Sequence, residues 1–446
     1  MEAQKLKAQA ELIRQVFEYI HRFKGRTFVI KIEGSLMSHP FFPLLVKDLV
    51  LLHRQGIQIV LVPGAKQRID EILTRYHVAW QTVEGVRIST PEAVPFIKMA
   101  AFDVSNRLMT QLAENATEAV IGNWVRSRGI GVLGGVDFQM SGVVERINVA
   151  IVRKILQDGL VPIFPNIGWS ATGKPYNISS SELAARLAGA LRADKLFFVS
   201  DQLGSGAREY RLPAGLERSD EGILTHLTAA QARELVALNR DKSGEEMIEL
   251  LRLAHGACSE GVSRVHIVDG EVEGVILQEI FSSRGCGTMV YANQHENIRE
   301  MQPRDIPEVL RIMQPFVEKQ ILLSRTESEL AERSGDYVVY EVDGIVHACG
   351  ALHLSASAPD RGEIAGVAVD ETYAGLGIGK RVLSSLIERA RKLQLRRLYV
   401  LTTQTWDWFV QFGFRDGGVA DLPPDKRELY DRRRNSRVLL LDLENQ

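Results

Sequence analysis

The sequence has little cysteine, no excess of charge of either sign and no long apolar run. Its 446 residues include three cysteines, Cys258, Cys286 and Cys349, which are odd in number and far apart. This usage argues against a disulfide framework and fits a reducing, cytoplasmic compartment. A net charge of −2 gives no sign of a nucleic-acid or membrane partner. No apolar run approaches the ~18 residues of a membrane span. The first 20 residues carry acids and lack an apolar core, unlike a signal peptide.

Strands and helices alternate through residues 25–292. The apolar, β-branched runs TFVIKI, IQIVLVPG and KLFFVSD predict strands that are buried on both faces. A helix is predicted at 43–55, stopped by Gly56. This order predicts a doubly wound α/β sheet, which binds ligands where strands end in glycine-rich turns. An amphipathic helix predicted at 5–23 must pack on its own domain or on another subunit.

The pattern changes after the polar stretch NQHENIRE, which we interpret as a linker. A helix, a hairpin turning at Asp343-Gly344 and the strand EIAGVAV follow. The glycine loop YAGLGIGKRVL, a long helix, the strand LRRLYVLTT and the segment FVQFGF complete an α+β domain. We therefore predict three parts: a helix for oligomerisation at 1–24, an α/β domain at 25–292 and an α+β domain at 299–446.

The glycine loop misses two nucleotide-binding patterns narrowly. A dinucleotide fingerprint fails at Lys380, and a P-loop pattern fails at Ala374, where its first glycine belongs. Closely spaced glycines still let backbone amides approach a pyrophosphate at a positive helix N-terminus, with Lys380 adding charge. The alternative is a structural turn without a ligand. The glycines are Gly375, Gly377 and Gly379.

The order of these elements, with VAVDETYAGLGIGKRVL and FVQFGF, resembles the GNAT family of acetyl-CoA-dependent N-acetyltransferases. Ala374 departs from the Gln or Arg that is usual in the family's loop. The resemblance implies that the loop at 374–380 holds CoA. It also implies that the preceding strand splays from its neighbour and pairs its backbone with pantetheine, through positions that match Gly366, Val367, Ala368 and Val369.

Amine acetylation needs a neutral amine, so a nearby carboxylate is useful, acting directly or through water. Glu363, at the start of the splayed strand, is the candidate base. Thr402 or Thr403 could protonate the CoA thiolate. The alternatives are an exposed strand-end glutamate and threonines that simply favour strands.

Two histidines and a cysteine, His347, Cys349 and His353, alternate onto one face of a predicted strand. A strand rises ~3.3 Å per residue, which places the two histidines ~20 Å apart, too far for one ion. We therefore expect no metal.

Several segments of the first domain resemble the amino acid kinase family, nearest to acetylglutamate kinase. They are FVIKIEGSLM, DFQMSGVVERINVAIVRKILQDGLVPIFPNIG, GKPYNISSSELAARLAGALRADKLFFVSD and RVHIVDG. Glu33 stands where the kinases have glycine, VPGAK replaces a glycine cradle, and Ser181 and Leu250 replace a catalytic Asp and Lys. Phosphoryl transfer depends on positioning and positive charge, so the fold is interpreted as retained for binding.

Arginine-sensitive acetylglutamate kinases carry an N-terminal helix with a tyrosine and a G-x-G-T segment after an acidic residue. The matching positions here are Tyr19, Glu279, Gly285 and Gly287. The resemblance implies an arginine site in which Glu279 pairs with the guanidinium and glycine carbonyls accept its other donors. A simple helix-end charge is the alternative for Glu279. The N-terminal helix further suggests a homohexamer of closed symmetry.

Together the two domains resemble the N-acetylglutamate synthase family, which implies acetyl transfer from acetyl-CoA to L-glutamate at the start of arginine biosynthesis, with L-arginine as effector. The resemblance implies that the guanidiniums of Arg325 and Arg434 bind glutamate, which suits a substrate with two carboxylates. The alternative for Arg434 is that it is merely solvated, since it lies in a basic run. The rival hypotheses are a bifunctional synthase–kinase and a non-catalytic arginine sensor with a CoA-binding domain. The implied glutamate positions are Leu323, Arg325, Gly366, Arg434 and Ser436.

Overall fold

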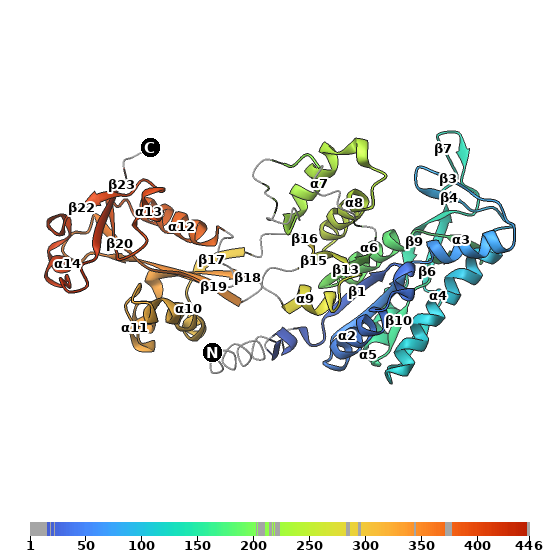
Figure 1. The fold of residues 1–446 in the computed structure, drawn as a ribbon, viewed down its shortest axis with the longest axis horizontal. Coiled ribbons are helices and arrows are strands. Elements are labelled where there is room, and N and C mark those ends of the chain that lie inside the picture. Colours follow the sequence, from blue (N-terminus) through green and yellow to red (C-terminus); the bar gives the residue numbers. More distant parts are fainter. Residues whose placement is uncertain are drawn as a thin grey trace. The chain divides into compact units, whose positions relative to one another are not determined.

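The structure is a computed structural model of the whole chain. It describes residues 16–443 except 18, 22, 202, 204–209, 214–215, 217, 219–223, 282–285, 293–295, 343–344 and 371–376. It divides into two compact units at residues 293 and 294, and each is treated by itself (Figure 1). Within the described ranges, no helix is long and apolar enough to cross a membrane.

The first unit is built on an eight-stranded sheet in the order β14-β16-β15-β13-β1-β2-β10-β5. Neighbouring strands run parallel, except that β15 and β16 are antiparallel. The buried strands predicted from TFVIKI, IQIVLVPG and KLFFVSD are confirmed as β1, β2 and β13. The strands are β1 (Thr27–Ile32), β2 (Gln58–Pro63), β5 (Ala119–Ile121), β10 (Val161–Ile163), β13 (Lys195–Ser200), β14 (His226–Thr228), β15 (Arg264–Asp269) and β16 (Thr288–Tyr291).

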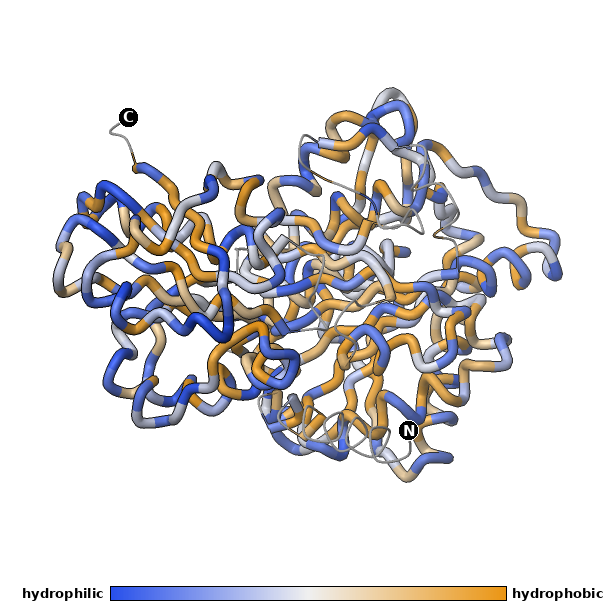
Figure 2. Tube along the Cα trace, turned by 60° about the vertical axis from the view of Figure 1, so that its left-hand side comes forward, coloured by the Kyte–Doolittle hydropathy of each residue, from blue (hydrophilic) through white to orange (hydrophobic). Residues whose placement is uncertain are grey.

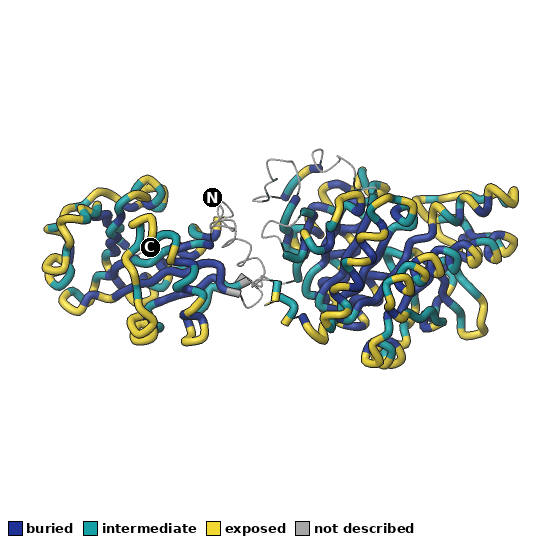
Figure 3. Tube along the Cα trace, turned by 60° about the horizontal axis from the view of Figure 1, so that its bottom comes forward, coloured by how far each residue is buried: buried dark blue, intermediate teal, exposed yellow. Residues whose placement is uncertain are grey.

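Helices cover both faces of this sheet, as a doubly wound fold requires. One apolar core packs α6 and α8 against the sheet, and another packs α2 and α9 against the opposite face. The interior of this unit is largely hydrophobic in Figure 2 and largely buried in Figure 3. The helix predicted at 43–55 is confirmed as α2 and ends before Gly56, where φ is +90°. The helices are α2 (Phe42–Arg54), α3 (Lys66–Arg75), α4 (Val94–Glu114), α5 (Val149–Gln157), α6 (Ser180–Leu191), α7 (Ala229–Leu238), α8 (Glu246–Ser259) and α9 (Val275–Phe281).

Smaller sheets complete the first unit. The strands β12, β11, β6 and β9 form a four-stranded sheet, and β3-β4 and β7-β8 form two-stranded ones. Of the helix predicted at 5–23, only residues 16–17, 19–21 and 23 are described, and these are helical. The additional strands are β3 (Gln81–Val83), β4 (Val86–Ile88), β6 (Val125–Gly129), β7 (Val132–Leu133), β8 (Val136–Asp137), β9 (Gly142–Ile147), β11 (Ile167–Trp169) and β12 (Pro175–Asn177).

Gly287, just before β16, lies where the backbone of β15 passes closely. A Cβ atom at Gly287 would be 2.4 Å from the carbonyl oxygen of Ile267. Because that oxygen cannot turn away, we expect Gly287→Ala to lower the free energy of unfolding of the first unit by about 3 kcal/mol. Gly256→Ala is the matched control, since its Cβ would meet nothing within 4 Å in α8. Urea unfolding checks both variants, and equal midpoints would contradict the expectation.

The second unit is built on a seven-stranded sheet in the order β17-β18-β19-β20-β21-β23-β22. The β20–β21 pair is parallel and the other neighbours are antiparallel. Helix α12 packs on one face and helix α10 on the other (Figure 1). The elements are β17 (Glu296–Glu300), α10 (Ile306–Glu318), α11 (Glu327–Glu332), β18 (Tyr337–Val342), β19 (Ile345–Leu354), β20 (Arg361–Val369), α12 (Ile378–Lys392), β21 (Arg397–Thr402), α13 (Trp406–Val410), β22 (Arg415–Gly417), α14 (Pro424–Glu428) and β23 (Arg437–Asp442).

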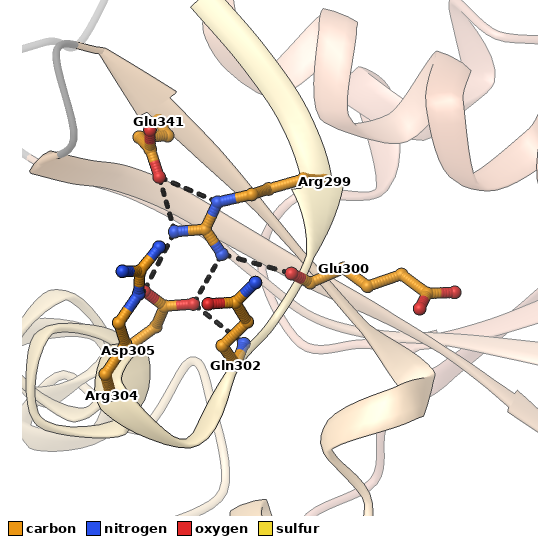
Figure 4. Close-up of polar contacts among 6 residues, drawn as sticks. All are labelled: Arg299, Glu300, Gln302, Arg304, Asp305 and Glu341. Carbon is orange, nitrogen blue, oxygen red and sulfur yellow. Dashed lines mark hydrogen bonds and ion pairs between the residues drawn. The ribbon is translucent and has the colours of Figure 1, made fainter.

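The prediction of a linker at 293–300 was wrong for residues 296–300, and residues 293–295 lie outside the described residues. Those residues form β17, which pairs antiparallel with β18. Arg299 holds the strand in place by donating to Asp305 at 2.6 and 2.9 Å and to Glu341 at 2.7 Å (Figure 4). Hydrogen bonds to these carboxylates raise the pKa of Arg299 further. The strand is therefore held by ion pairs to residues elsewhere in the chain, which the polar residues of 296–300 alone do not predict.

Candidate active site

An open seam lies between β20 and β21 in the second unit. The two strands pair over only four positions, from Arg361 with Arg397 to Ile364 with Val400. β20 continues to Val369, so in the described part of the sheet its last five residues have no partner on β21. Their backbone donors and acceptors on that side are open to a ligand, because edge-like backbone groups can pair with an added chain.

A β-bulge at Gly366 reshapes β20 beside this seam. The register to β19 shifts from Ala351 opposite Ala365 to Cys349 opposite Ala368, which leaves one extra residue in β20. Gly366 has a φ of +59°, in the left-handed region that favours glycine. A Cβ atom there would lie 3.4 Å from the ring of Tyr337. The bulge therefore brings the open backbone of β20 directly under Tyr337.

Glu363 lies at the other end of the same strand and is 8% exposed. It is therefore not the exposed strand-end glutamate of the alternative hypothesis. Its Oε2 is 2.7 Å from Nζ of Lys426 on α14. On the neighbouring strands it stands opposite His353 and Tyr399. Burial, together with the nearby carboxylates of Glu363 and Asp425, raises the pKa of the Tyr399 hydroxyl.

Two side chains that the sequence analysis did not assign to the site, Tyr337 and His353, share this face. Tyr337 is buried beside Gly366, and Arg325 is close enough to hydrogen-bond it. Burial raises the pKa of Tyr337, an effect that the Arg325 charge opposes. The ring of His353 lies edge-on to Tyr337, with centroids 5.7 Å apart. The feature that points to His353 is its pairing with the candidate base Glu363 across two strands. This pairing can be recognised only when the strand register is known.

Two segments far apart in the sequence meet beside this face. The guanidinium of Arg434 donates to the carbonyl of Ile321 at 2.6 Å. This contact brings the segment that holds Arg434 and Ser436 against the one that holds Leu323 and Arg325. The Ser436 carbonyl accepts from Tyr430 at 2.6 Å, and Leu323 is 56% exposed. The structure thus brings the predicted glutamate positions into one region, and the basic run is not merely solvated at Arg434.

The described part of the glycine loop begins the helix on the opposite face of the sheet. Gly377 is the N-cap of α12 with φ +72°. A Cβ at Gly379 would lie 3.4 Å from Trp408 and 3.5 Å from Val369, so α12 approaches both closely there. Lys380 is exposed. Val367 and Val369 pack on the α12 side, whereas Ala368 is buried on the α10 side. Ala374 and Gly375 lie outside the described residues.

The predicted acid and base lie on opposite faces of the sheet. Thr402 shares the α12 face, because Leu398 and Val400 at alternate positions belong to that core. Its hydroxyl lies 2.9 Å from that of Thr405 and accepts from the Thr405 amide at 3.1 Å. The hydroxyl of Thr403 is buried and has no hydrogen-bond partner in the described structure. A substrate that exchanges protons with both Glu363 and these threonines would have to lie in the seam between β20 and β21, because the two groups are on opposite faces of the sheet.

Two of the three residues considered for a metal, His353 and Cys349, have separate environments. His353 Nδ1 lies 2.7 Å from Asp336, and the thiol of Cys349 lies 3.5 Å from the Gly366 carbonyl. Across the described ranges, no group of three or more His, Cys, Asp or Glu side chains could hold a metal ion.

In the first unit, the ends of β1 and β2 lie side by side, at the positions that the resemblance to the kinases matches to their phosphate site. Burial lowers the pKa of Lys31 to about 8, and its ammonium contacts the carboxylate of Glu33. Glu33 also lies over Gly64, where a Cβ atom would be 2.5 Å from its Oε2. Leu250 is buried in α8, and Ser181 lies in the first turn of α6. The lysine of this site is therefore covered by a carboxylate of the same chain.

The predicted arginine-site residues that are described lie around a buried polar chain. Lys195 Nζ is 3.1 Å from His266 Nε2, and His266 Nδ1 is 2.7 Å from Glu279. The amides of Cys286 and Gly287 donate to the other oxygen of Glu279 at 2.8 and 3.0 Å. Glu279 is therefore not a helix-end charge, and a guanidinium would have to share or replace these donors.

Burial and the Lys195 charge lower the pKa of His266 to about 4, so this imidazole is neutral near pH 7. Burial opposes ionisation of Glu279, but the hydrogen bonds from His266 and the two amides lower its pKa to about 2. Tyr19 stacks on Phe23 with centroids 4.3 Å apart, and Lys195 lies below both rings. Gly285 lies outside the described residues.

The two units define a class of protein, an amino acid kinase fold joined to an acetyltransferase. Residues 26–269 match the amino acid kinase family, and residues 300–414 match the acetyltransferase (GNAT) family. An amino-acid acetyltransferase of Actinobacillus pleuropneumoniae serotype 7 (strain AP76) is 34% identical over 438 residues, covering 96% of this chain and 97% of the relative. The chain belongs to this amino-acid acetyltransferase family, the N-acetylglutamate synthases with fused domains, and is an N-acetyltransferase.

Solved structures agree over nearly the whole chain. N-acetylglutamate synthase from Neisseria gonorrhoeae complexed with coenzyme A and L-arginine is similar with a TM-score of 0.82 and 29% identity, covering 98% of this chain and 99% of that one. The same synthase complexed with coenzyme A and N-acetylglutamate gives a TM-score of 0.59 and 30% identity, with the same coverage. The predicted resemblances of both domains and the fold class are thus confirmed.

Proposed function

We propose that this chain transfers the acetyl group of acetyl-CoA to the α-amino group of L-glutamate, the first step of arginine biosynthesis. The observation that carries the proposal is the convergence of Glu363, Arg325 and the open backbone at Gly366 on one face of one sheet. The similarity to a synthase complexed with coenzyme A and N-acetylglutamate supports the proposal, because these two molecules are the products of the proposed reaction.

The substrate would lie along the seam between β20 and β21. CoA would be held at the N-terminus of α12, where Gly377 and Gly379 allow the backbone to approach a pyrophosphate and Lys380 adds charge. Arg325 and Arg434 would each bind one glutamate carboxylate, with Leu323 and Ser436 beside them. The free backbone of Gly366, Val367 and Ala368 would pair with pantetheine and bind the thioester carbonyl.

The chemistry proceeds by direct transfer in a ternary complex. Glu363 accepts one proton of the glutamate ammonium through water, which produces the neutral amine. The amine nitrogen forms a bond to the acetyl carbon, and backbone amides of β20 stabilise the oxyanion. The C–S bond then breaks, one of the two protons left on the nitrogen passes to the sulfur by way of Thr402 or its neighbour Thr403, and the other stays on the amide product. No step requires a metal.

Release of free thiol from acetyl-CoA on addition of L-glutamate tests the proposal. We expect thiol release that depends on both substrates and is matched by N-acetylglutamate formation. ADP formation from ATP and acetylglutamate would instead favour the bifunctional synthase–kinase, which Ser181 and Leu250 argue against. Binding of arginine and CoA without acetyl transfer would leave the non-catalytic sensor.

Removal of the Arg325 guanidinium should weaken glutamate binding. A hydrogen bond to a charged group contributes about 1.5–3 kcal/mol, so Arg325→Ala is expected to raise KM for glutamate at least tenfold. KM for acetyl-CoA should not change, since the CoA loop lies on the other face of the sheet. An unchanged KM for glutamate in steady-state kinetics would refute the role of Arg325.

The first unit would act as an arginine-binding regulatory domain. The similarity to a synthase complexed with L-arginine supports this, as do Tyr19 and Glu279 around one buried polar chain. We propose that L-arginine inhibits the transferase through coupling between two sites, in a cytoplasmic homohexamer. Light scattering and thiol release, each with and without arginine, test this. A monomer under both conditions would refute the hexamer, and an unchanged rate would refute the inhibition.

A further inference from the structure

A buried histidine stands beside the candidate base and has one nitrogen without a partner. His353 is 8% exposed, and its Nδ1 lies 2.7 Å from the carboxylate of Asp336. Its Nε2 is buried and has no hydrogen-bond partner in the part of the chain that the structure describes. A buried polar atom without a partner costs free energy, so this nitrogen requires an explanation that packing does not give.

Asp336 determines which nitrogen of His353 is available. The aspartate carboxylate is an acceptor, so Nδ1 carries the proton and donates to it, while Nε2 keeps a lone pair. The Tyr337 ring packs against the imidazole and fixes its orientation. The arrangement therefore presents an oriented acceptor rather than a donor.

Strand register places His353 directly across from Glu363. His353 on β19 pairs with Glu363 on β20, and both side chains are on the α10 face, because directly opposite residues share a face. Glu363 is already paired with the Lys426 ammonium. An imidazole takes up a proton on its nitrogen lone pair and becomes a cation, which a neighbouring carboxylate such as that of Asp336 stabilises.

We propose that His353 accepts the proton that Glu363 removes from the substrate ammonium, and that Asp336 orients and stabilises the resulting imidazolium. The inference rests on the proposed acetyl transfer. One N–H bond of the ammonium breaks, the proton passes from Glu363 through a bridging water to Nε2, and it leaves to solvent after the amine has attacked. His353 acts through Glu363 and does not touch glutamate, so it is a positioning residue. The charged or titratable groups around it are Asp336, Tyr337, Glu363, Asp425 and Lys426, with Arg325 and Arg333 acting on Tyr337.

Two substitutions of His353 separate this role from a structural one. His353→Asn keeps an N–H that can donate to Asp336 but removes the Nε2 lone pair, and His353→Gln loses the Asp336 contact. We expect His353→Asn to lower kcat by about tenfold or more, with KM for glutamate unchanged and a changed acidic limb in the pH profile of kcat. If the histidine is only structural, His353→Asn should instead be near wild type, and only His353→Gln, which loses the Asp336 contact, should be impaired. Wild-type kcat and pH profile in His353→Asn would overturn the proposal.

Asp336→Asn provides a second readout if His353 variants do not fold. A neighbouring carboxylate favours the charged imidazole, so its removal should move the acidic limb of kcat to lower pH by about 0.5 to 1 unit. Asp416→Asn, at an exposed position on β22, is the matched control and should leave the limb in place. An unmoved limb in Asp336→Asn would overturn the proposal. A wild-type enzyme that releases no thiol with glutamate would instead refute the proposed function itself.

Discussion

Replacement of Glu363 by glutamine is expected to lower kcat for acetyl transfer by about 100-fold or more, with little change in KM for glutamate. A positioned general base contributes roughly 100- to 10,000-fold, and glutamine keeps the shape of the side chain while losing its ability to take a proton. The lost pair with Lys426 should matter little for stability, because the Lys426 side chain is 27% exposed and can turn to solvent. Initial rates across pH, with thermal unfolding in parallel, measure both effects.

Two further variants make this result specific. Lys426→Met removes the partner but keeps the carboxylate, so it should retain far more activity than Glu363→Gln. If Glu363 and His353 form one proton path, Glu363→Gln and His353→Asn together should cost little more than Glu363→Gln alone, since coupled residues are not additive. A Glu363→Gln enzyme with kcat within threefold of wild type would remove the carboxylate from the mechanism.

Replacement of Arg434 by alanine is expected to raise KM for glutamate by about 100-fold. The loss has two physical origins: a charged contact to a substrate carboxylate, worth about 1.5–3 kcal/mol, and the bond that holds this segment to the Ile321 carbonyl. Arg434→Lys should lie between alanine and wild type, because a lysine keeps the charge without the planar fork.

Arg432 supplies the matched control for Arg434. It belongs to the same basic run but is exposed, so Arg432→Ala should leave KM for glutamate unchanged. Steady-state kinetics at saturating acetyl-CoA compare the three variants. Equal effects of Arg432→Ala and Arg434→Ala would mean that the run acts only through its total charge.

Much of the fold could be predicted because local patterns and burial agree. The runs that became β1 and β13 are continuous apolar stretches, and the stripe of α12 is buried at Val382, Leu386 and Ala390. β17 was missed because its residues are polar and the strand depends on Arg299. Local propensity carries no information about such an ion cluster.

The sequence suggested several residues of the candidate site but none of the contacts between them. Arg434 and Ile321 are 113 positions apart, and Lys426 reaches Glu363 from another element, so neither contact has a sequence pattern. His353 was weighed only as a metal ligand. Its position opposite Glu363 follows from the register between two strands. The alternation of side chains along one strand shows which residues share a face but not which residues of the next strand they pair with.

The short β20–β21 seam also has a thermodynamic consequence. Only four residue pairs join the β17–β20 half of the sheet to the β21–β22 half. A ligand that pairs with the free part of β20 would take the place of the missing strand pairing. Ligand binding would therefore also join the two halves of the sheet. Those amides of residues 365–369 that face away from β19 should then exchange hydrogen slowly only when CoA is bound. The apparent stability of the second unit should rise with the logarithm of CoA concentration.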